Sequence, residues 1–130
     1  MQGTGAQVAY VAVLAIIVWW AIHQRTCDVD RLTVDRLNIN TLETALGTYM
    51  LDTGSYPTTS QGLEALLQRP AGVSGWKGPY LPIIRLDSWG RPYGYRYPSD
   101  HGDEPDIFSY GADGRPGGVG KDADFYSWRP

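Results

Sequence analysis

The chain has 130 residues, a formal net charge of −3 and one cysteine, Cys27. This length allows one modest domain, and a single cysteine excludes both an intrachain disulfide and a cysteine metal cluster. The acidic balance argues against a nucleic-acid partner, because binding to phosphates requires a basic surface.

The N-terminal segment from Ala6 to Ile22 is almost wholly apolar and carries no charged side chain. As a helix it spans about 26 Å, close to the roughly 30 Å of a bilayer core. Trp19 and Trp20 stand at its C-terminal end and Arg25 follows, an order typical of a membrane boundary. A cleaved signal peptide and a buried core helix are the alternatives. The first lacks its basic flank and small-residue cleavage motif, and the second has too little remaining protein to cover it.

The sequence therefore predicts an N-terminal segment over residues 1–26, with an uncleaved transmembrane anchor at about 6–22, and a second domain over 27–130. The second domain begins with a helical stalk over 27–52. Apolar residues at spacings of three and four predict one buried face on this helix. They are Ile39, Leu42, Leu46, Tyr49 and Met50. The acidic residues at its start, which alternate with arginines, predict a solvated surface. They are Asp28, Asp30 and Asp35.

The long helix is expected to end near Asp52, because Gly54 favours a left-handed cap and Pro57 prevents renewal. A short second helix is predicted over Leu63–Leu67, and the stretch between Trp76 and Trp89 is typical of an ordered loop. Further on, alternating tyrosines over residues 93–97 and a run over 106–110 predict two strands. We interpret the tyrosines as core and cross-strand packing.

The densest chemical signal is the loop over residues 110–124, which holds five glycines in ten positions. Asp113, Asp122 and Asp124 supply hard oxygen ligands, and calcium binds six to eight such oxygens in tolerant geometry. Magnesium suits the loop less well because it requires a stricter octahedron. The spacing is not that of an EF-hand. An ordinary flexible loop is the alternative, since Asp-Gly is also a common turn dipeptide.

No catalytic motif stands out in the sequence. His101 lies in an acidic turn, where it is either a solvated turn residue or a base or metal ligand, and no nucleophile elbow accompanies it. We therefore expect that the chain is not an enzyme.

Several ordered blocks carry a resemblance to a known family. They are residues 49–59 (YMLDTGSYPTT), 61–66 (QGLEAL), 78–81 (GPYL), 87–93 (DSWGRPY), 106–114 (DIFSYGADG), 122–124 (DAD) and Trp128. In these blocks the chain resembles the major pseudopilins of bacterial type II secretion, within the type IV pilin-like family. The similarity runs from about Leu42 to Trp128.

The resemblance implies an α+β, pilin-like fold. Its parts are a long N-terminal helix (membrane anchor plus amphipathic half), a short second helix, a small antiparallel sheet and a C-terminal calcium loop. It also implies that calcium is held by the carboxylates of Asp113, Asp122 and Asp124. The main-chain oxygens of Tyr110 and Arg115 are the further ligands implied.

The function implied is that of a structural subunit that polymerises through its N-terminal helix into a periplasmic pseudopilus. The implied partners are further copies of the chain, minor pseudopilins and inner-membrane secretion components. The implied location is the bacterial inner membrane, crossed once, with the C-terminal domain in the periplasm. The N-terminus departs from the family pattern, because Ala6 rather than Phe follows Gly5 and no carboxylate lies between Met1 and Ile22. A non-polymerising, membrane-anchored adaptor or binding module is therefore the alternative.

Overall fold

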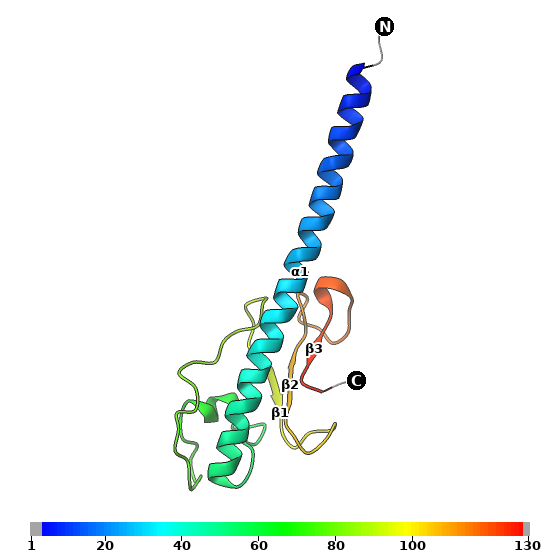
Figure 1. Cartoon of the computed structure of the whole chain (residues 1–130). Coiled ribbons are helices and arrows are strands. Elements are labelled where there is room, and N and C mark those ends of the chain that lie inside the picture. Colours follow the sequence, from blue (N-terminus) through cyan, green and yellow to red (C-terminus); the bar gives the residue numbers. More distant parts are fainter. Residues whose placement is uncertain (1–3, 129–130) are drawn as a thin grey trace. The chain divides into compact units, whose positions relative to one another are not determined.

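A computed structural model describes residues 4–128, with side chains over 11–23 and 30–128 (Figure 1). The elements in chain order are α1 (Thr4–Thr53), the 3₁₀ turn η1 (Leu63–Leu66), β1 (Gly94–Arg96), β2 (Asp106–Ser109), the 3₁₀ turn η2 (Gly120–Asp122) and β3 (Phe125–Tyr126). The chain divides into two compact units, Met1–Arg31 and Leu32–Pro130.

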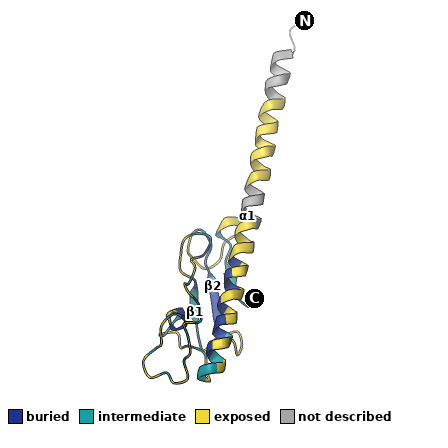
Figure 2. Cartoon of the chain, turned by 60° about the vertical axis from the view of Figure 1, so that its left-hand side comes forward, coloured by how far each residue is buried: buried dark blue, intermediate teal, exposed yellow. Residues whose placement is uncertain are grey.

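The N-terminal unit consists of the first part of α1. Its described apolar side chains, from Val11 to Ile22, are exposed (Figure 2). Trp19 stacks on His23 with ring centroids 4.8 Å apart. Over the described residues, no helix combines the length and the apolar character needed to cross a membrane. The start of the predicted anchor, residues 6–10, lies outside the side chains that the structure describes.

The second half of α1 forms the central element of the C-terminal unit. One face of this half is buried, and four of the predicted residues lie on it: Ile39, Leu42, Leu46 and Tyr49. Ala45 is buried with them, whereas Met50, the fifth predicted residue, is half-buried. The helix ends at Thr53, and Gly54 adopts a φ of 88° while its N–H donates to Met50 O at 2.8 Å. The predicted left-handed cap is therefore confirmed.

The three strands form an antiparallel sheet in the order β1-β2-β3, and the sheet lies beside the second half of α1 (Figure 1). Tyr95 pairs with Ile107, and Phe108 pairs with Tyr126. Ile107 lies in the core, whereas Phe108 contacts the rings of Tyr110 and Trp128. The first two strands lie within the predicted ranges 93–97 and 106–110.

The segment after α1 differs from the prediction in its helix type. The expected helix over Leu63–Leu67 is a four-residue 3₁₀ turn, η1, preceded by Gly62 without a side-chain cap. Buried Leu66 still anchors the turn in the core, and Leu66 O accepts the N–H of Tyr80 at 2.8 Å. The following stretch to Trp89 is an ordered loop without a helix or strand, as predicted.

The prediction of a solvated stalk is wrong at Asp35. This side chain is only 4% exposed, and its Oδ1 accepts hydrogen bonds from Tyr93 OH at 2.7 Å and Ser88 N at 2.9 Å. Asp35 therefore faces the folded unit, where two donors replace the water that a carboxylate otherwise requires. Asp30 and Arg36 are exposed as predicted, and the side chain of Asp28 lies outside those described.

Candidate metal centre

The glycine-rich loop leaves β2 after Ser109 and returns to β3 at Phe125. A Cβ at Gly111 would lie 2.7 Å from Asp122 O, and one at Gly118 would lie 2.4 Å from the same atom. Both glycines also have positive φ, 59° and 105°. Only glycine fits these two positions, and the loop can close tightly around the main chain of Asp122 for that reason.

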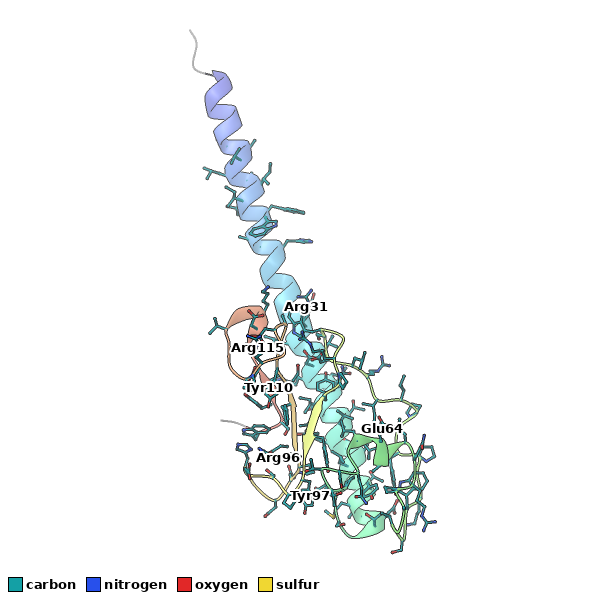
Figure 3. All side chains as sticks on the ribbon, turned by 180° about the vertical axis from the view of Figure 1, so that it is seen from behind. Arg31, Glu64, Arg96, Tyr97, Tyr110 and Arg115 are labelled. Carbon is teal, nitrogen blue, oxygen red and sulfur yellow. The ribbon has the colours of Figure 1, made fainter. Side chains whose placement is uncertain are left out.

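Two main-chain hydrogen bonds hold the loop, one across it and one within its first turn. The Ala112 N–H donates to Lys121 O at 3.0 Å, and the Gly114 N–H donates to Tyr110 O at 3.0 Å. The implied main-chain ligands, Tyr110 and Arg115, belong to this same loop (Figure 3). Because a carbonyl oxygen has two lone pairs, Tyr110 O keeps one for a further partner.

The three predicted carboxylates have different surroundings. Asp113 is exposed, and its Oδ1 accepts the Arg115 N–H at 3.0 Å. Asp122 is half-buried at the end of η2. Asp124 is also half-buried, and its Oδ2 accepts the Gly117 N–H at 2.7 Å.

Tyr126 is a site residue that the sequence analysis missed. Its hydroxyl donates to Asp124 Oδ2. This hydrogen bond, together with burial and the negative charge of Asp124, raises the pKa of Tyr126 to about 12. The sequence signal is the spacing of two from Asp124, which directly precedes β3, because residues two apart in an extended segment point to the same side.

The surroundings of the other oxygen of Asp124 indicate whether the loop can hold a cation. Asp124 Oδ1 is buried and has no hydrogen-bond partner among the described residues. A buried carboxylate oxygen without a partner is costly, and a hard cation satisfies it. No three His, Cys, Asp or Glu side chains are grouped closely enough to hold a metal in the part of the chain that the structure describes. Asp124 therefore offers one buried oxygen that a hard cation would satisfy, and Asp113 and Asp122 lie on the same loop.

A second polar cluster surrounds Asp106, which is 1% exposed. It accepts hydrogen bonds from Ser99 Oγ at 2.6 Å and Arg96 Nη2 at 2.7 Å, and His101 Nδ1 lies 3.0 Å from it. Burial opposes ionisation of Asp106, but these three partners outweigh it and lower the pKa of Asp106 below its ordinary value. His101 also stacks on Trp128 at 4.0 Å. The predicted solvated turn histidine is thus exposed but held in place.

Solved structures with the same architecture define the class of protein. The crystal structure of the major pseudopilin from the type 2 secretion system of enterohaemorrhagic Escherichia coli matches with a TM-score of 0.66 and 31% sequence identity. The match covers 82% of this chain and 90% of that chain. The fold is therefore that of a pseudopilin, as the resemblance implied.

Curated relatives narrow the class to one family. The type II secretion system core protein G of Pseudomonas aeruginosa is 39% identical over 125 residues, which cover 93% of this chain and 87% of that protein. Its Vibrio cholerae counterpart is 44% identical over 94 residues, covering 70% of this chain and 64% of that protein. The family described as type II secretion system, protein G matches residues 25–128. The chain belongs to this family, which is a family of structural pseudopilins and not of enzymes.

Proposed function

We propose that the chain is a structural subunit of a type II secretion pseudopilus and polymerises through the apolar half of α1. Family membership and the pseudopilin fold support the class of function. The observation that carries the assembly proposal is the row of exposed apolar side chains in the N-terminal unit. Their exposed fractions run from 45% at Leu14 to 64% at Val11 and Ile16.

Such a row is unfavourable in water, because each Å² of exposed apolar surface costs roughly 25 cal/mol relative to burial. Two environments can cover it. In the free subunit the cover is the lipid of the inner membrane, in which residues 6–22 serve as a single-pass anchor with residues 27–130 in the periplasm. In the filament the cover is a bundle of the same helices from neighbouring copies. The same segment thus serves as anchor and as assembly surface.

The C-terminal unit offers a second apolar surface for packing between copies. A groove runs between the second half of α1 and the loop over residues 81–86. Val34 and Leu37 line one wall, Ile83 and Leu86 line the other, and all four are exposed. Exposed apolar patches of this kind mark interaction surfaces. In this proposal the groove contributes to contacts within the filament, alongside minor pseudopilins and inner-membrane secretion components as further partners.

Calcium is the second part of the proposal. Asp113, Asp122 and Asp124 would hold it, with main-chain oxygens of Tyr110 and Arg115, and the support is the unpartnered buried oxygen of Asp124. When bound, calcium would neutralise the carboxylates that hold it and would order a loop that is rich in glycine. The chain's own part is to supply these oxygens from one loop. The 27–52 stalk and the sheet provide the rigid base.

Disulfide cross-linking tests the assembly proposal. In a Cys27→Ser background, Val18→Cys places the one thiol on the apolar row, and Ser74→Cys places it on an exposed loop as the matched control. Oxidation of membranes is expected to give dimers and higher species for Val18→Cys above the level of the control. If Val18→Cys stays monomeric while the protein is folded and membrane-bound, the chain is the non-polymerising adaptor instead.

A further inference from the structure

Arg91 connects the candidate metal loop to a distant part of the fold. Its Nη1 donates to Gly111 O at 2.6 Å. A Cβ at Gly114 would lie 3.1 Å from Arg91 Cζ and 3.2 Å from its Nε, so the guanidinium lies close to the Gly114 backbone. The guanidinium thus contacts the loop at two points, on either side of the ligand candidate Asp113.

The main chain of Arg91 is itself held rigidly. Asp87 Oδ1 accepts the Arg91 N–H at 2.8 Å, and the Asp87 N–H donates to Arg91 O at 2.8 Å. The second oxygen, Asp87 Oδ2, accepts the hydroxyl of buried Ser109 at 2.6 Å. Ser109 is the last residue of β2, where the loop begins. Asp87 therefore holds both the base of Arg91 and the start of the loop that Arg91 contacts.

The geometry points to Arg91 as the residue that positions the 110–114 segment for calcium. By donating to the Gly111 carbonyl and lying close to Gly114, Arg91 holds the neighbouring peptides of Tyr110 and Asp113 in place. Residues that orient ligands without touching the metal typically change metal affinity by 10–100-fold when they are removed. This inference rests on the calcium part of the proposed function.

Electrostatics alone predicts the opposite change in calcium affinity when Arg91 is removed, so an experiment can separate the two explanations. A guanidinium near a calcium site repels the ion, so its removal should tighten binding if electrostatics governs. If Arg91 instead positions the loop, removal of its guanidinium should weaken calcium binding. The sign of the change in affinity separates the two accounts.

The experiment is calcium titration of the purified full chain by calorimetry, with Arg91→Met, Arg91→Lys and the control Arg69→Met. Arg69 is exposed and its Nε donates to Val73 O at 2.8 Å, so its loss removes the same charge and a like hydrogen bond from another loop. We expect Arg91→Met to raise the Kd on the order of tenfold and Arg69→Met to leave it unchanged. Arg91→Lys keeps the charge without the planar fork, and we expect it to restore only part of the affinity.

A second readout needs no calcium. The amides of Ala112 and Gly114 donate within the loop, so Arg91→Met should speed their hydrogen exchange in chelator while leaving the core amides of Leu46 and Ile107 unchanged. Unchanged exchange, or a Kd equal to or lower than that of the wild type, overturns the inference. A wild-type chain that binds no calcium removes the calcium proposal as well, and this outcome is distinguishable because it appears before any variant is made.

Discussion

Position 75 accepts only glycine, because of its backbone conformation and the space around it. Its φ is 76°, and a Cβ there would lie 2.3 Å from Asp52 O at the end of α1. The close approach brings the loop onto the helix end, where Lys77 Nζ lies 2.8 Å from Asp52 Oδ1 and Tyr80 OH donates to Asp52 Oδ2 at 3.0 Å. Both the conformation and the space exclude a side chain.

We expect Gly75→Ala to destabilise the C-terminal unit by about 2 kcal/mol or more, since a non-glycine residue at positive φ alone costs roughly 1–2 kcal/mol. Gly72→Ala is the matched control. Gly72 has a φ of 75°, and nothing lies within 4 Å of the Cβ position. Urea denaturation of the two variants measures the difference. Equal midpoints would show that the contact with Asp52 relaxes freely and that only the φ angle matters.

At the scale of elements, Asp106 joins β1, β2 and the turn between them. Arg96 lies on β1, Asp106 begins β2, and Ser99 and His101 lie in the connecting turn. Because the pKa of Asp106 is lowered in the folded chain, its contribution to stability is present above its ordinary pKa of 3.8. The contribution is lost as pH falls below that value through the folded-state pKa.

Asp106→Asn is therefore expected to lower the free energy of unfolding by about 2 kcal/mol near neutral pH, where a charged acceptor is lost. As pH is lowered from about 5 to below the ordinary pKa of 3.8, the difference from the wild type should shrink, because the wild-type carboxylate takes up a proton as pH falls through its lowered folded-state pKa. Urea denaturation across this range measures it. A difference that is constant with pH would mean that the effect comes from shape and not from charge.

The sequence predicts the elements of this fold unevenly, for physical reasons. The buried face of α1 is visible because Leu42, Leu46 and Tyr49 recur at helical spacing. In contrast, β3 has two residues, too few for alternation to be visible. The burial of Asp35 cannot be predicted from its local sequence, because its partners, Ser88 and Tyr93, lie 53 and 58 residues away. The contacts of Arg91 with the loop depend on tertiary approach in the same way, whereas Asp113, Asp122 and Asp124 share one local segment.

At the scale of the whole molecule, calcium should act on stability. A ligand that binds only the folded state adds RT ln(1 + [L]/Kd), about 2.7 kcal/mol at a hundredfold excess over Kd. We expect calcium to raise the melting temperature, magnesium to do so less, and chelator to remove the effect. Asp124→Asn, which weakens the buried ligand, should abolish the response. Asp103→Asn serves as control, because Asp103 is exposed in the 99–105 turn outside the loop. A midpoint that is the same in all three solutions contradicts the calcium proposal.

The proposed assembly uses the apolar half of α1, whose described apolar side chains from Val11 to Ile22 are exposed. The exposed side chains from Val11 to Ile22 form a surface with few polar interruptions, suited to lipid and to like helices. If that surface is the polymerisation interface, a polar substitution within it should prevent assembly without unfolding the C-terminal unit, whose core starts at Ile39.

Electron microscopy of the purified full chain after detergent removal in calcium-containing buffer tests this claim most directly. The account predicts filaments for the wild type and their loss for Leu14→Lys, with the melting temperature of the C-terminal unit unchanged. Monodisperse single subunits in the wild-type sample, folded and without helix–helix contacts, would contradict polymerisation through α1.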